Sequence, residues 1–162
     1  MKSSALSEKA PLLSEINAVK TSFSGRTGVV SERHDKSMTI TRSLVVSVVD
    51  DDESVRESLP DLLNEFGFAS RVYASAEEFL ASDVVSETRC LILDIAMPGM
   101  AGPDLHRELK RRQLEIPTIF ITAHRDQTVR SRMLEEGAVE CLFKPFSDTD
   151  LLAALNTALR IR

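Results

Sequence analysis

The sequence predicts an α/β fold, a doubly wound sheet of five parallel strands with helices on both of its faces. One observation is that five short runs rich in Val, Ile and Leu alternate with stretches in which apolar residues recur every three or four positions. A second is that the segments between these runs are long enough to be helical crossovers, which join parallel strands. Alternating strands and helices of this kind bury both faces of the sheet.

The first two strands and the helices after them follow from local patterns. Residues 44–49 (LVVSVV) are β-branched and short, as in a buried strand. Residues 69–74 form a second predicted strand, and Ser75 with Glu78 three positions later offers a capping box to a short helix. Between the two strands, Gly67 can end a helix whose apolar face is formed by Val55, Leu59, Leu62, Leu63 and Phe66.

The second half of the pattern contains three more strand and helix pairs. Pro103 fits the first turn of a helix, and Gly137 fits the position after the end of one. The last helix can begin at Ser147 or Asp148, and its apolar residues are leucines. The predicted strands are residues 89–95, 117–122 and 139–143, and the predicted helices are residues 103–112, 126–136 and the segment from 147 to about 159.

Composition divides the chain into two parts. Residues 1–43 contain 13 Ser or Thr, seven basic and four acidic residues, whereas residues 44–162 carry 13 basic and 21 acidic residues. We therefore predict a flexible N-terminal extension over residues 1–43 and one domain over residues 44–162. A net charge of −5 gives no general reason to expect nucleic-acid binding.

The chain shows no signal for a membrane or for export. No apolar run approaches the roughly 18 residues that span a bilayer, and the first twenty residues lack a continuous apolar stretch. Cys90 and Cys141 both fall in apolar strand-like runs, so we interpret them as buried thiols in a reducing compartment. We expect a cytoplasmic protein.

Reactive side chains stand at four of the five predicted strand ends. Asp50 and Asp51 end the first strand, Asp94 the third, Thr122 the fourth and Lys144 the fifth. Each is often structural when alone, as an acid at a helix start, a helix cap or a surface charge. Together they would meet in the crevice where open α/β sheets bind ligands.

Chemistry then suggests a role for this crevice. Clustered carboxylates repel one another and need a cation, and all-oxygen ligands suit Mg²⁺. Lys144 adds a fixed positive charge and Thr122 a hydrogen-bond donor. These groups predict a site for a phosphoryl group, with Asp94 as its nucleophile.

Residues 44–160 resemble the receiver domain of two-component response regulators, most closely those of the FixJ type. The matching motifs are VVDDDESVRESL, LILDIAMPGMAG, PTIFITA and FKPF. The resemblance implies the flavodoxin-like strand order 2-1-3-4-5. It also implies that Asp94 is the phosphoacceptor, that Thr122 and Lys144 bind the phosphoryl group, and that Mg²⁺ is held by Asp50, Asp51, Asp94 and the backbone carbonyl of Ala96. Asp52 lies one residue past the matching pair, and we interpret it as an acid that begins a helix.

Two features depart from the family pattern. Receivers usually carry Tyr or Phe three residues before the lysine, as a switch coupled to the threonine, whereas this chain has Cys141. Phe143 would replace that ring only imperfectly, because it lies one pleat further along the strand. The chain also ends at Arg162 without the helix-turn-helix that FixJ-type proteins use to bind DNA, so no DNA-binding domain is expected.

The favoured hypothesis is a single-domain response regulator, not an enzyme apart from its own phosphorylation and dephosphorylation. Its expected partners are a sensor histidine kinase or phosphotransfer protein and a downstream protein, with phosphate-sink duty equally compatible. The surface of helix 126–136, strand 139–143 and the last helix would carry the output and allows a homodimer. An alternative is a phosphorylation-independent interaction module. A haloacid dehalogenase-type phosphatase is disfavoured, because that family needs an acid where this chain has Ala96.

Overall fold

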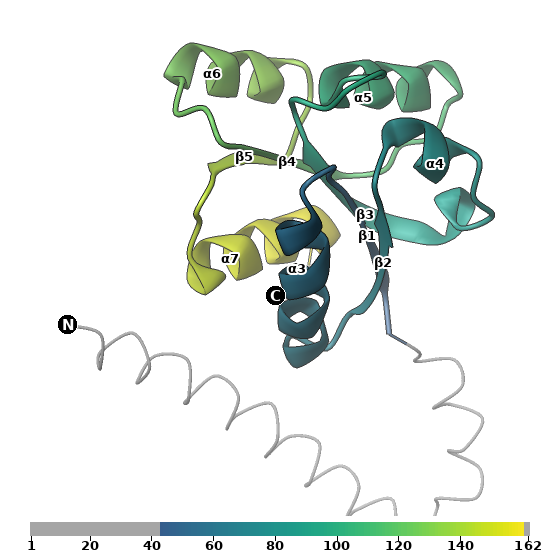
Figure 1. Cartoon of the computed structure of the whole chain (residues 1–162), viewed down its shortest axis with the longest axis vertical. Helices are drawn as coiled ribbons and strands as arrows, with labels where there is room; N and C mark the ends of the chain where they lie inside the picture. The colour runs from purple at the N-terminus through teal and green to yellow at the C-terminus, as the bar shows by residue number, and fades with distance from the viewer. Residues whose placement is uncertain (1–42, 161–162) are drawn as a thin grey trace, which may run out of the picture. The chain divides into compact units, whose positions relative to one another are not determined.

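The computed structural model describes residues 43–160, so all but Ser43 of the predicted N-terminal extension lies outside the described residues. The described chain forms one sheet of five parallel strands in the order β2-β1-β3-β4-β5 (Figure 1). The predicted fold class and strand order are therefore confirmed. The strands are β1 (Val45–Val49), β2 (Ala69–Tyr73), β3 (Thr88–Asp94), β4 (Thr118–Thr122) and β5 (Glu140–Phe143).

Helices cover both faces of the sheet, as Figure 1 shows. Buried residues of α3 and α7 pack with one face, and buried residues of α4, α5 and α6 pack with the other. A short 3₁₀ turn, η1 (Val85–Glu87), precedes β3. The helices are α3 (Glu53–Glu65), α4 (Ala76–Leu80), α5 (Gly102–Arg111), α6 (Gln127–Glu135) and α7 (Asp148–Leu159).

Polar caps fix where several helices begin. Asp52, the predicted helix-start acid, accepts the backbone N–H of Ser54 at 3.0 Å and so caps α3. Ser75 accepts the N–H of Glu78 at 3.0 Å, which is half of the predicted capping box. The other half differs, because the Glu78 carboxylate accepts the N–H of Ala74 at 2.8 Å, one residue earlier than in the usual box.

Two apolar clusters form the core, one on each face of the sheet. Cys90 belongs to the cluster beneath α3 and α7, and Cys141 to the cluster beneath α4, α5 and α6. Both thiols are free and buried. The two thiols lie on opposite faces of the sheet, which keeps them apart and agrees with the prediction that they stay reduced.

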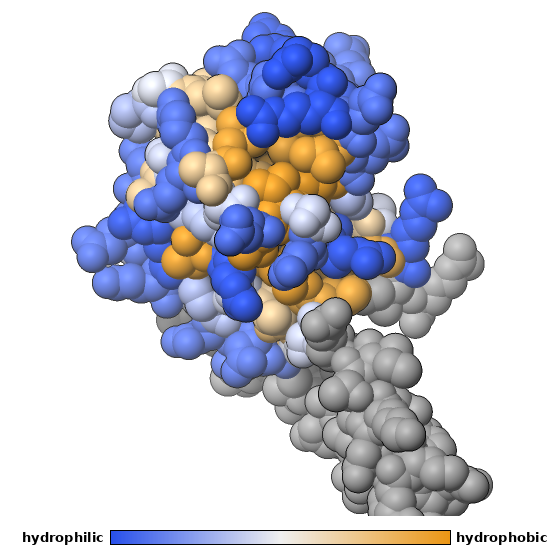
Figure 2. All heavy atoms as spheres, turned by 90° about the vertical axis from the view of Figure 1, so that its right-hand side faces the viewer, coloured by the Kyte–Doolittle hydropathy of each residue, from blue (hydrophilic) through white to orange (hydrophobic). Residues whose placement is uncertain are grey.

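β2 and β5 are the edge strands, and an arginine side chain donates to a backbone carbonyl of each. On β2, the Arg71 guanidinium donates to the Ser70 carbonyl at 2.9 Å. Figure 2 shows the side of the molecule that carries β2, where apolar atoms reach the surface between polar ones. Val72, on this strand, is a large hydrophobic residue that is 39% exposed. Charged side chains at an edge discourage pairing with another chain.

Candidate functional site

The sheet brings the three predicted acids together at its carboxyl edge. Asp50 directly follows β1, and Asp94 is the last residue of β3. One carboxylate oxygen from each of Asp50, Asp51 and Asp94 lies within 4.8 Å of the others. The rule that parallel strands present their carboxyl ends to one crevice therefore placed these three side chains correctly relative to one another.

Lys144 completes the cluster from the end of β5, at the same carboxyl edge of the sheet. It directly follows β5, and its Nζ lies 2.8 Å from Asp50 Oδ2 and 3.6 Å from Asp94 Oδ1. Burial lowers the pKa of Lys144, but the hydrogen bond to Asp50 and the charge of Asp94 outweigh this, so the pKa is raised overall. The ammonium group therefore stays charged at neutral pH and offsets part of the carboxylate repulsion.

Asp50 is fully buried, and each of its carboxylate oxygens has a partner. Oδ1 accepts the backbone N–H of Asp52 at 2.8 Å, while Oδ2 accepts Lys144 Nζ. Its backbone carbonyl accepts a guanidinium N–H of Arg56 at 3.0 Å. A buried carboxylate without partners would be costly, so these bonds explain how a charge is kept inside the fold. They also fix the orientation of the carboxylate toward the crevice.

The surroundings of Asp94 disfavour its ionised form. It is 5% exposed, and burial, followed by the neighbouring charge of Asp50, raises its pKa to about 7. Lys144 opposes this rise, and the carboxyl of Asp51 adds to it. A cation placed among these oxygens would remove the repulsion, and the all-oxygen donor set suits a hard divalent ion such as Mg²⁺.

Thr122 occupies the end of β4, beside the end of β3. It is 2% exposed, and its Oγ1 accepts the backbone N–H of His124 at 3.1 Å. This bond uses a lone pair of the hydroxyl oxygen, which leaves the O–H able to donate. The Thr122 carbonyl also accepts the N–H of Lys144 at 2.8 Å, so the two predicted phosphoryl-binding residues are joined through their backbones.

The loop after Asp94, residues 95–101, is fixed by backbone hydrogen bonds at both ends, and the first of these joins it to β4. The N–H of Ile95 donates to the Ile121 carbonyl, and the N–H of Gly102 donates to the Ile95 carbonyl, each at 3.0 Å. A Cβ at Gly102 would lie 2.2 Å from the Asp94 carbonyl oxygen, so only glycine allows α5 to begin this close to Asp94. Ala96 lies in the loop between these anchors.

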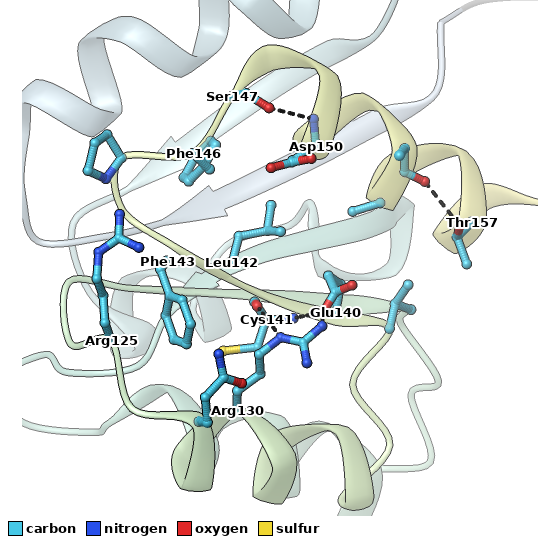
Figure 3. Close-up of a pocket in the computed structure, with 15 residues that line it drawn as sticks. Arg125, Arg130, Glu140, Cys141, Leu142, Phe143, Phe146, Ser147, Asp150 and Thr157 are labelled. Atoms are coloured by element: carbon cyan, nitrogen blue, oxygen red, sulfur yellow. Dashed lines mark hydrogen bonds and ion pairs between the residues drawn. The ribbon is translucent and has the colours of Figure 1, made fainter.

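Cys141, the predicted switch position, lies apart from the acidic crevice. A groove between α6 and α7 runs along β5 and contains none of the three acids (Figure 3). Cys141 lines it but is only 1% exposed, and burial raises the pKa of its thiol to about 11. A protonated, buried thiol is a poor nucleophile, so Cys141 acts as an apolar residue.

Arginine side chains occupy the outer surface around Cys141. Arg130 of α6 donates from Nε to the Cys141 carbonyl at 3.2 Å and pairs with Glu140 Oε1 at 2.7 Å. Arg125 lies over the ring of Phe143, 5.9 Å from its centroid. Figure 3 shows both arginines on the side of the groove that α6 and its preceding loop form. The sequence reasoning missed these contacts, because nothing in a single sequence indicates which strand atom a long helix side chain will reach.

A parallel five-stranded α/β fold with three acids, a threonine and a lysine at its carboxyl edge defines a receiver-like protein. The family model of the response regulator receiver domain matches residues 46–156. The chain therefore belongs to the response regulator receiver family, and the identification made from the motifs is confirmed. Among the described residues no helix has the length and apolar character needed to cross a membrane.

Relatives and solved structures agree with this assignment. The chain is 43% identical over 114 residues to nodulation protein W of Bradyrhizobium diazoefficiens, covering 70% of this chain and 50% of that protein. It is 38% identical over 120 residues to the response regulator protein TodT of Pseudomonas putida, covering 74% and 53%. The crystal structure titled FixJ-N matches with a TM-score of 0.66 and 37% identity, covering 75% of this chain and 98% of that one. The chain thus spans about half the length of the curated relatives it matches.

Proposed function

We propose that the chain accepts a phosphoryl group on Asp94 from a sensor histidine kinase or a phosphotransfer protein, in a Mg²⁺-dependent reaction. A carboxylate oxygen of Asp94 attacks phosphorus as the bond to the donor nitrogen breaks, giving an acyl phosphate. Water later cleaves that bond and restores the carboxylate. The domain is a substrate of its kinase, and the chemistry of its own is limited to self-phosphorylation and self-dephosphorylation.

The observation that carries this proposal is that Asp94 lies among groups of opposite charge. Two acids and one ammonium surround its nearly buried carboxyl group, and burial, followed by the charge of Asp50, raises its pKa to about 7 although Lys144 opposes this. When bound, Mg²⁺ would neutralise negative charge shared by the carboxylates and the phosphoryl oxygens. Asp50, Asp51, Asp94 and the Ala96 carbonyl are the proposed ligands, and Lys144 and Thr122 the proposed contacts to the phosphoryl group.

The proposed output is a change in the surface formed by α6, β5 and α7, which a downstream protein reads. Support comes from the backbone link between Thr122 and Lys144, because these residues stand at the end of β4 and just after β5 and border this surface. Homodimerisation through the same surface and use of the domain as a phosphate sink are compatible with the proposal. Two free, buried thiols also fit the proposed cytoplasmic location.

The competing proposal is an interaction module that works without phosphorylation. The thiol at position 141 favours it, since the aromatic switch of the family is missing. The compact acidic cluster argues against it, because the three carboxylates repel one another and a module that takes no phosphoryl group has no use for them.

Phosphorylation by acetyl phosphate, followed by intact mass measurement, tests the proposal. With Mg²⁺ the full chain should gain the mass of one phosphoryl group, and without Mg²⁺ it should gain none. Asp94→Asn should remove the gain, whereas Asp61→Asn, an exposed acid of α3, should keep it. A wild-type chain that takes up nothing, or an Asp94→Asn variant that is still modified, would show the assignment to be wrong.

A further inference from the structure

We propose that Glu77 is a positioning residue for the phosphoacceptor loop, residues 95–101, and through it for the metal-binding carbonyl of Ala96. This inference rests on the proposed function, because it concerns the same site. Glu77 accepts a hydrogen bond from the backbone of this loop, so its role is to hold that backbone rather than to bind a ligand.

The contact itself joins two segments that are distant in the sequence. Glu77 lies in the first turn of α4, and its Oε2 accepts the backbone N–H of Met100 at 3.0 Å. Gly99 has a positive φ of 75°, and a Cβ there would lie 2.9 Å from the same carboxylate oxygen. Glycine therefore both allows the turn and leaves room for the carboxylate to reach the next amide.

The rest of the loop shows why this bond matters. Ile95 and Gly102 are fixed by backbone bonds, and the Met97 side chain is buried in the core. Ala96, Pro98 and Gly99 are exposed, so the outer half of the loop has little packing to hold it. Glu77 supplies a charged acceptor at that half.

Metal chemistry makes the position of this loop important. Mg²⁺ requires near-ideal octahedral geometry with short bonds to oxygen, so a loop that moves by a fraction of an ångström would hold its carbonyl ligand less well. Groups that orient the direct ligands commonly alter metal affinity when they are removed. Glu77 is exposed, so we expect an effect at the small end of that range.

Glu78 provides a matched control. It is also exposed, lies in the same turn of α4, and its carboxylate also accepts one backbone N–H, that of Ala74, at 2.8 Å. A general effect of acids at the start of α4 would therefore appear equally in Glu77→Ala and Glu78→Ala. An effect through the loop would appear only in Glu77→Ala, and Glu77→Gln should recover part of it because its amide oxygen can still accept.

The experiment measures Mg²⁺ affinity by calorimetry and amide exchange at Met100 by NMR, in the full chain. In Glu77→Ala the Met100 amide should exchange faster and the dissociation constant for Mg²⁺ should rise roughly three- to tenfold. Glu78→Ala should change that constant less than about twofold. With acetyl phosphate at saturating Mg²⁺, the phosphorylation rate of Glu77→Ala should return close to that of the wild type.

The outcomes separate this inference from the proposed function. Equal Mg²⁺ affinities in Glu77→Ala and the wild type, or an equal loss in Glu78→Ala, would overturn the role of Glu77. Wild-type Mg²⁺ binding without any uptake of phosphoryl groups would overturn the proposed function while the role of Glu77 in the metal site stands. A wild type that binds no Mg²⁺ would overturn both.

Discussion

The acidic crevice and the groove along β5 belong to one domain but follow different rules. In the crevice, every side chain expected from the family motifs is present, and the three acids and Lys144 lie within a few ångströms of one another. In the groove, the usual aromatic residue is replaced by the small, buried thiol of Cys141, and arginines cover the strand from outside (Figure 3).

Under the proposed function, the difference follows from what each region would recognise. Transfer of a phosphoryl group has fixed charge requirements, which leave little freedom in the residues of the crevice. A surface that meets a protein partner has only to be complementary to that partner, so its residues can change together with the partner's. We therefore expect substitutions in the crevice to have large effects that depend on pH and Mg²⁺, and substitutions in the groove to have smaller effects on conformational coupling.

The largest expected effect concerns the stability of the Mg²⁺-free protein as a function of pH. Asp94 has a pKa of about 7 in the folded state and about 4 when unfolded. The unfolded state therefore loses its proton first, and the wild type should lose stability as pH rises from about 4 to 7 and no further above that. Each pKa unit is worth about 1.4 kcal/mol, so Asp94→Asn should be more stable than the wild type by roughly 2 to 4 kcal/mol at pH 8.

Urea denaturation of both proteins at pH 4.5 and pH 8, without divalent cations, measures this effect. The advantage of Asp94→Asn should be small at pH 4.5, where the carboxyl is protonated in the fold. Added Mg²⁺ should stabilise the wild type more than the variant at pH 8. A stability difference that does not change with pH would show that Asp94 is not strained by its neighbours.

Asp51→Asn gives the next largest effect, on metal affinity. Asp51 is the exposed member of the three acids, so its carboxylate is the one that a cation from solvent reaches most directly. The substitution should weaken Mg²⁺ binding roughly tenfold or more and slow phosphorylation, because one charged ligand is lost. The apo fold should become slightly more stable, by under about 1 kcal/mol, since repulsion is relieved near the surface.

Calorimetric titration with Mg²⁺ and thermal denaturation without it provide the two readouts. Asp61→Asn serves as the control, since it removes an exposed acid of α3 that is not part of the cluster. If the Mg²⁺ titration of Asp51→Asn matches that of the wild type, Asp51 is not a ligand and the proposed three-acid metal site is wrong.

Some features of the molecule could be predicted from the sequence, and others could not. The carboxyl ends of parallel strands meet at one edge of a sheet. The sequence pattern alone therefore predicts that Asp94 lies close to Asp50 and Lys144, as it does. Helix starts followed from short polar side chains, as at Asp52 and Ser147. Such rules work because they depend on residues adjacent in the chain or on topology, both of which the sequence encodes directly.

Contacts of long side chains could not be predicted in this way. Glu77 reaches an amide 23 residues away, and Arg130 reaches a strand carbonyl, yet each could have pointed into solvent at little cost. The sequence also could not predict that Cys90 and Cys141 lie on opposite faces of the sheet, since this depends on the register between strands. A one-residue change of register in β5 would have placed Cys141 on the other face.

The smallest expected effect concerns signalling through position 141. A ligand or modification shifts an equilibrium only through contacts that differ between its two states. The Cys141 thiol is buried and too small to exchange an exposed for a buried position, so one such contact is missing here. Coupling from Asp94 should then pass mainly through Thr122 and the following loop, where Arg125 lies over Phe143.

Cys141→Tyr should restore the missing contact and enlarge the phosphorylation-dependent change in amide exchange across residues 123–150. A ring at this site has to fit beside Arg130, so the variant should also lose roughly 1 to 3 kcal/mol of stability, which denaturation of the unphosphorylated protein measures. Cys141→Ala is the control, because it removes the thiol without adding a ring and should leave the exchange difference as it is in the wild type. If the wild type already shows as large a change as Cys141→Tyr, the thiol does not weaken the switch. The pair formed by Arg125 and Phe143 would then be the first candidate for the element that replaces the missing aromatic ring at position 141.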